Sequence, residues 1–136
     1  MTGFIEELHR EHIELQGLLG VIRKNGLGSS EGSEALIRLI GKLRDHVQKE
    51  GDRLYPPLIE AARRTDVIYG LEGRVKEIAH EMDGLSGRLA YFVAEYGKNS
   101  ENPENDQNFH RLADVLNARI RQEEETVFRF YEKLVE

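Results

Sequence analysis

Apolar residues recur at α-helical spacing in four blocks of this chain, and no other feature constrains the fold as strongly. Side chains three and four positions apart lie on one face of a helix, so each block predicts an amphipathic helix. The predicted helices cover residues 3–24, 33–58, 66–96 and 103–134. Stretches rich in Gly, Ser, Asn and Pro separate them, as expected for loops. Because short loops place consecutive helices antiparallel, we predict an all-α, antiparallel up-down-up-down four-helix bundle.

Residues that favour helix ends mark some of the boundaries. Ser33 is the candidate N-cap of the second predicted helix. Asn102 is the candidate N-cap of the fourth, with Pro103 as its first helical residue. The Pro56-Pro57 pair is expected to kink or interrupt the second helix, because proline lacks the backbone N–H that a helix interior needs.

The composition narrows the possible functions. The chain has 136 residues, which suits a single domain over residues 1–136. It contains five His and no Cys, so any metal must be held by His, Asp and Glu. Its net charge of -6 argues against nucleic-acid binding. It has no apolar run long enough for a membrane helix and no apolar signal core, so we expect a cytoplasmic protein.

Several ionisable residues fall on the apolar helix faces, where charges are unusual. At about 100° per residue, His12 lies within the apolar face of the first helix, and His46 and Glu50 lie within that of the second. Arg119 and Glu123 take the same two angles on the fourth helix. These two residues stand 73 positions after their counterparts (123 − 50), with Arg in one copy where the other has His.

The third helix offers two candidates, Glu81 and His80. Its apolar face is centred near Ile78, so Glu81 lies on the flank of that face and His80 points almost the opposite way. A local kink or a wider helical turn would rotate His80 inward. Both residues therefore remain candidates at this point.

The candidates also lie at one level along the bundle. His12 and His46 are each 17 positions from Ser29, the centre of the first loop. Counted from the centres of the second and third loops, near Thr65 and Glu101, the candidates on the third and fourth helices lie a similar number of positions away and so at the same level. His110 is about 15 Å from that level at the helical rise of about 1.5 Å per residue. We therefore interpret His110 as a surface residue. His9 lies at the margin of the apolar face of the first helix.

Two imidazoles and two or three carboxylates in a dry interior are costly unless they are paired or bound to a metal ion. Imidazole and carboxylate without thiolate suit iron, manganese or zinc. The alternative is a metal-free helical interaction or regulatory module. In that alternative Arg119 neutralises the buried carboxylates, and both histidines are hydrogen-bonded core residues.

Three stretches of the chain resemble the hemerythrin-like, or HHE cation-binding, domain family. They are LHREHIEL with His12, HVQKEGDRLYP with His46 and Glu50, and the Glu123-Glu124 pair before Val-Phe. The resemblance covers essentially the whole chain. It implies a four-helix bundle that holds non-haem iron, commonly as a di-iron centre, with roles in oxygen or nitric oxide binding, sensing and iron handling.

The same resemblance implies a ligand set and one departure from the family. The implied ligands are His12, His46, Glu50 and Glu123, with His80 or Glu81 from the third helix. Arg119 stands where the family has a histidine, and arginine stays protonated and cannot serve as a ligand. The sequence thus leaves open a di-iron centre, a mononuclear iron site, another divalent cation or an empty site.

We expect a protein that is not an enzyme and that binds iron, with a small diatomic molecule such as oxygen or nitric oxide as its partner. No phosphate-binding loop, dinucleotide fingerprint or nucleophile–base arrangement points to catalysis. An oxidative di-iron enzyme, which carboxylate-rich bundles also support, is the least supported class. The sequence predicts neither a protein partner nor the oligomeric state.

Overall fold

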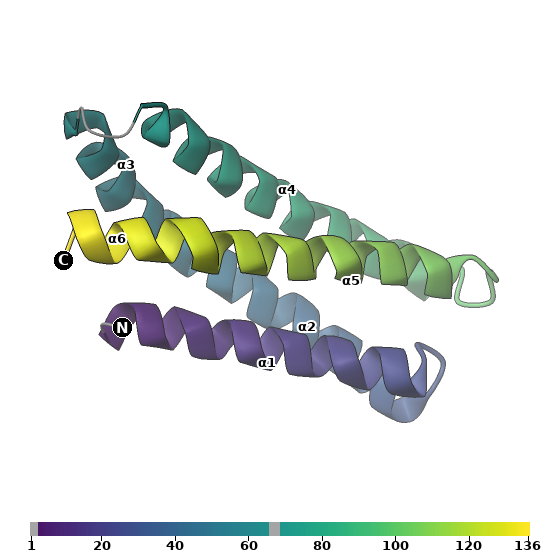
Figure 1. The fold of residues 1–136 in the computed structure, drawn as a ribbon. Helices are drawn as coiled ribbons and strands as arrows, with labels where there is room; N and C mark the ends of the chain where they lie inside the picture. The colour runs from purple at the N-terminus through teal and green to yellow at the C-terminus, as the bar shows by residue number, and fades with distance from the viewer. Residues whose placement is uncertain (1–2, 66–68) are drawn as a thin grey trace.

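The computed structural model describes residues 3–65 and 69–136, which form four helical segments running in alternating directions (Figure 1). The first segment is α1 (Gly3–Asn25). The second comprises α2 (Ser30–Lys49), the wide π-helical turn η1 (Glu50–Leu54) and α3 (Tyr55–Arg64). The third is α4 (Leu71–Lys98). The fourth comprises α5 (Asn105–Gln122), the π-helical turn η2 (Glu123–Val127) and α6 (Phe128–Leu134). The predicted all-α bundle is confirmed, and the described residues include no strand.

The buried apolar side chains form two clusters along the bundle. We call one of them the upper cluster. It lies near the loops at residues 26–29 and 99–104, at the right of Figure 1, and contains residues such as Leu15, Leu39, Leu85 and Leu116. The lower cluster, toward the chain ends, includes Leu8, Leu54, Ile78 and Val127. On three of the four segments, polar residues lie between the two clusters. None of the described helices is long and apolar enough to cross a membrane.

The second segment begins earlier than predicted. Ser29, rather than Ser33, is the N-cap, because its hydroxyl accepts a hydrogen bond from the Gly32 N–H at 2.9 Å. Ser33 lies inside the first turn, where its N–H donates to the Ser29 carbonyl oxygen at 2.9 Å. Gly26, with a φ of 85°, turns the chain so that its carbonyl oxygen lies against Gly32. The prediction of Ser33 as the N-cap was wrong because the loop places the Gly26 carbonyl against Gly32 and the helix already starts at Ser30.

The fourth segment begins later than predicted, at Asn105 rather than Pro103. The Asn102 side chain accepts a hydrogen bond from the Glu104 N–H at 2.9 Å. Its backbone N–H donates to the Asn99 carbonyl oxygen at 3.1 Å. Asn102 therefore closes a turn before the helix instead of capping it, and the predicted cap was wrong.

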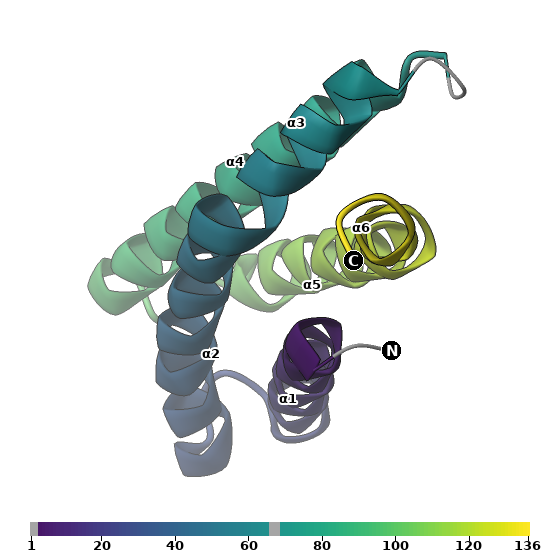
Figure 2. The ribbon, with the colours of Figure 1, turned by 90° about the vertical axis from the view of Figure 1, so that its left-hand side faces the viewer.

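The two other predicted boundaries concern Pro56, Pro57 and the start of the third helix. The prolines lie in the first turn of α3, where a missing N–H costs no helical hydrogen bond. The segment bends near this point, as predicted (Figure 2). The predicted start at Asp66 lies outside the described residues, and α4 begins at Leu71 after Gly70, which has a φ of 78°.

The two π-helical turns accommodate an unusual spacing of buried residues. From His46 to Ala62, buried side chains follow one another at steps of four. In a regular α-helix this spacing would place the Ala62 side chain about 160° around the helix axis from that of His46. A π-helical turn accommodates extra residues and reduces this drift. The wide turns begin at Glu50 and Glu123, so both carboxylates lie where the helices change their geometry.

Candidate metal centre

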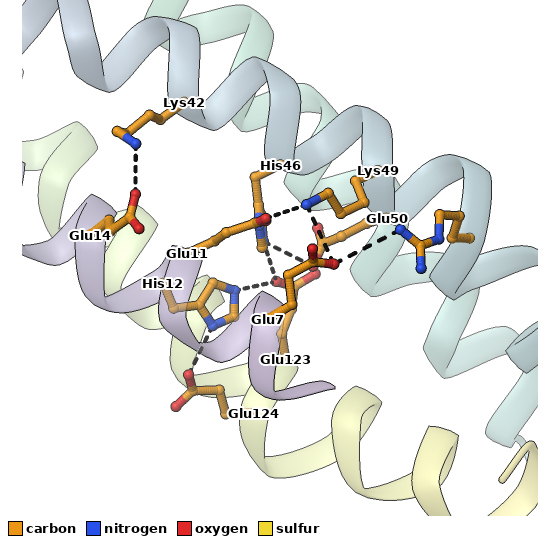
Figure 3. A network of polar contacts seen from close by, with 11 residues as sticks. Glu7, Glu11, His12, Glu14, Lys42, His46, Lys49, Glu50, Glu123 and Glu124 are labelled. Atoms are coloured by element: carbon orange, nitrogen blue, oxygen red, sulfur yellow. Dashed lines mark hydrogen bonds and ion pairs between the residues drawn. The ribbon is translucent and has the colours of Figure 1, made fainter. Parts of the chain in front are cut away.

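Four buried ionisable side chains meet between the two apolar clusters (Figure 3). They are His12 from α1, His46 from α2, Glu50 from η1 and Glu123 from η2. Each offers one ligand atom, and these four atoms lie within 4.8 Å of one another. Two ligands on opposite sides of one ion are about 4.2 Å apart, given bonds of about 2.1 Å. Small side-chain adjustments would therefore let all four groups bind one ion.

The structure brings together four of the six predicted ligands and leaves the two on α4 outside. Glu81 lies at the flank, and its Oε2 is 3.0 Å from Nη1 of Arg119, with both side chains 30% exposed. His80 is exposed, because α4 is an unbroken α-helix and does not turn this side chain inward. His110 is exposed on α5, as predicted.

His46 contacts carboxylates through both ring nitrogens. Its Nδ1 is hydrogen-bonded to Glu11 Oε1 at 2.6 Å, and Lys49 holds the other oxygen of Glu11. Its Nε2 lies 3.0 Å from Glu50 Oε2, without the alignment of a hydrogen bond, and 3.8 Å from Glu123 Oε1. Burial acts to lower the pKa of His46, but the three surrounding carboxylates outweigh it and raise the pKa to about 12.

His12 is fixed in the same manner from the opposite side. Its Nδ1 is hydrogen-bonded to Glu124 Oε2 at 2.8 Å, and its Nε2 to Glu123 Oε1 at 3.0 Å. His9 holds the same oxygen of Glu124 at 2.7 Å. The ring of Phe128 stacks on His12 with centroids 5.1 Å apart. These contacts leave His12 little freedom to rotate.

Both histidines therefore use Nδ1 for an outer carboxylate and direct Nε2 toward the cluster. This arrangement is typical of metal-binding histidines, whose second nitrogen bonds a carboxylate that sets the ring orientation. The outer carboxylates Glu11 and Glu124 were not predicted as functional residues, although Glu124 lies in a stretch that resembles the family. Each acts on a histidine of another helix, and spacing along one helix carries no signal of such a contact.

The two inner carboxylates have opposite environments. Glu123 accepts hydrogen bonds from His12 and from the hydroxyl of Tyr55, which was not predicted as a functional residue either. Burial raises the pKa of Glu123, but its contacts with His12 and His46 outweigh that effect and lower it. The pKa of Glu50 is raised well above its usual value, first by burial and then by the charge of Glu123.

Three buried atoms at the centre of the cluster have no hydrogen-bond partner among the described residues. They are Nε2 of His46 and both carboxylate oxygens of Glu50. An unpaired buried polar group costs about 1–3 kcal/mol, so native proteins rarely leave three together. A cation that displaces the proton of His46 would pair with all three, and nitrogen and carboxylate donors suit iron, manganese or zinc.

Arg119 does not neutralise the inner carboxylates. Its Nη1 pairs with Glu81 and donates to Gln122 Oε1, each at 3.0 Å. Within the described chain it forms no ion pair with Glu50 or Glu123. The metal-free alternative requires contacts of Arg119 with the inner carboxylates, and the described residues show only its ion pair with Glu81 at the flank.

Comparison with known proteins agrees with this geometry. The sequence model of the hemerythrin HHE cation binding domain matches residues 3–131, a range that includes the whole cluster. Searches of curated proteins and of solved structures found no match.

Proposed function

Since the chain belongs to the hemerythrin HHE cation-binding domain family, we propose that it binds non-haem iron between its helices. The proposed ligands are His12, His46, Glu50 and Glu123. The observation that carries the proposal is the group of unpaired atoms on His46 and Glu50. With neutral imidazoles, the two inner carboxylates carry a charge of about -2, which one divalent cation neutralises.

We further propose a small diatomic molecule, oxygen or nitric oxide, as the physiological ligand. Bound iron with an open coordination position supplies the binding of such a molecule. The chain contributes orientation and shielding: Glu11 and Glu124 fix the two imidazoles, and Tyr55 fixes Glu123. In this arrangement the protein serves in sensing or iron handling and not in turnover.

The surroundings of the cluster suggest a route from solvent. A cavity of about 280 Å³ lies between α1 and α2, and His46 and Glu11 are among the residues that line it. Lys42 and Lys49 line it as well. The cavity is large enough for a diatomic molecule, while the cluster itself remains buried.

Elemental analysis of freshly purified protein from iron-replete cells tests the metal. We expect bound iron in the wild type and a sharp fall in His46→Ala and Glu50→Ala, because each loses a donor. His110→Ala removes an exposed imidazole outside the cluster and should leave the iron content unchanged. Wild-type protein with under about a tenth of an equivalent of iron would refute the proposal.

A further inference from the structure

We propose that the cluster holds one metal ion and that the second half of the bundle retains an altered copy of the same half-site, with Arg119 supplying the charge of a second ion. This inference rests on the proposed function and concerns the number of ions. It comes from comparing the hairpin of α1 and α2–α3 with the hairpin of α4 and α5–α6.

The first helices of the two hairpins repeat one pattern of buried residues. Positions on α4 follow those on α1 by 70 residues (82 − 12). The buried pairs around the cluster are Leu8 and Ile78, His12 and Met82, and Leu15 and Leu85. Met82 is therefore the counterpart of His12. It is 1% exposed, and its thioether is a weak ligand for the hard cations that carboxylates prefer.

The second helices repeat at 73 residues, and the structure adds a feature that the sequence did not reveal. The wide turns η1 and η2 start at Glu50 and Glu123, which are counterparts (123 − 50). Glu124, which orients His12, has Gly51 as its counterpart. At the position that corresponds to His12 the altered copy has Met82, and at the position that corresponds to Glu124 it has Gly51. It therefore has neither the imidazole nor the carboxylate that would orient it.

Both hairpins nevertheless contain an outer contact between a glutamate and a cationic side chain. In the first hairpin Glu11 holds His46 at 2.6 Å, and in the second Glu81 holds Arg119 at 3.0 Å. Glu81 follows Glu11 by 70 residues, and Arg119 follows His46 by 73. Both hairpins have a glutamate at this position, and the second has a permanently charged guanidinium where the first has an imidazole.

Charge balance then limits the metal content. Glu81 pairs with Arg119, Glu11 pairs with Lys49, and Glu124 is 31% exposed to water. Glu50 and Glu123 are therefore the buried carboxylates whose charge is left for metal. One divalent ion neutralises these two carboxylates. A second would add two uncompensated positive charges in a buried layer next to a fixed guanidinium, which is strongly unfavourable.

Anaerobic equilibrium dialysis against Fe²⁺, followed by elemental analysis, measures the number of ions per chain. We expect one ion in the wild-type protein. Two ions would overturn this inference and leave the proposed function intact, whereas no ion would refute the proposed function itself. The wild-type protein alone thus separates the two failures.

Substitutions test the altered copy directly. The triple variant Met82→His, Arg119→His and Gly51→Glu restores two imidazoles and an outer carboxylate, and a Cβ at Gly51 meets nothing within 4 Å. We expect it to bind two Fe²⁺ ions per chain. The matched control Met82→Leu with Arg119→Lys keeps the charge without imidazole and should bind one ion. A folded triple variant, checked by circular dichroism, that still binds one ion would overturn the altered copy.

Discussion

Replacing Glu50 by methionine should stabilise the metal-free protein while abolishing its stabilisation by metal. Glu50 is 1% exposed, and both of its carboxylate oxygens lack hydrogen bonds. Methionine has a similar length and fills irregular core space without strong polar groups. The substitution therefore removes a buried group that the metal-free fold does not satisfy.

The structure indicates which of two opposing effects is larger. Removing the unpaired carboxyl group should raise the free energy of unfolding by about 1–3 kcal/mol. Breaking a buried ion pair usually costs about 3–5 kcal/mol when it strands a charge. His46 is not stranded, because Glu11 remains at 2.6 Å and Glu123 at 3.8 Å. We therefore expect net stabilisation without metal.

Bound metal should make the wild-type protein more stable than Glu50→Met. At an Fe²⁺ concentration 100 times its Kd, the wild type gains about 2.7 kcal/mol, and the variant gains little because it has lost a ligand. Urea denaturation followed by circular dichroism, in EDTA and in anaerobic Fe²⁺, measures both values. Asp52→Met removes an exposed carboxylate from the same wide turn and should change neither. Destabilisation of Glu50→Met in EDTA by more than about 2 kcal/mol would refute the reasoning, because Glu50 would then support the fold itself.

Two further outcomes follow from the loop and from the electrostatics of the cluster. Gly32→Ala should lower stability in thermal denaturation by about 1–3 kcal/mol or more, because its Cβ would lie 1.8 Å from the Gly26 carbonyl oxygen. Gly41→Ala, with nothing within 4 Å, should raise stability by about 0.5–1 kcal/mol, and an equal loss in both variants would contradict the clash. Metal binding at pH 7 should release protons, because the raised pKa of His46 keeps its imidazole protonated until an ion displaces that proton, and the raised pKa of Glu50 acts in the same direction. Affinity should therefore fall as the pH is lowered, and calorimetry in buffers of different protonation enthalpy that detects no proton exchange would contradict this.

The sequence was sufficient to predict the bundle and the four buried residues of the cluster. His12, His46, Glu50 and Glu123 could be found because each occupies an apolar stripe and all lie at one level, so face and position along the helix were enough. Glu81 was ambiguous because a residue at the flank of a stripe can turn either inward or toward a neighbour. In the structure it pairs with Arg119.

Other features depended on contacts between distant parts of the chain. The choice between Ser29 and Ser33 as N-cap was decided by the approach of the Gly26 carbonyl to Gly32, and both serines have suitable side chains. The steps of four after His46 are present in the sequence, but they do not indicate where a π-helical turn begins, and the structure places it at Glu50. The outer carboxylates Glu11 and Glu124 also could not be predicted, because each contacts a histidine on another helix.

The position of the polar layer also affects how the domain unfolds. The upper and lower apolar clusters are separate, so a fluctuation that opens one end need not disturb the packing of the other. The helical backbones and the four side chains His12, His46, Glu50 and Glu123 join the two halves. An ion bound to all four would link three of the helical segments at that junction. Metal occupancy would then determine whether the bundle opens as one cooperative unit or as two.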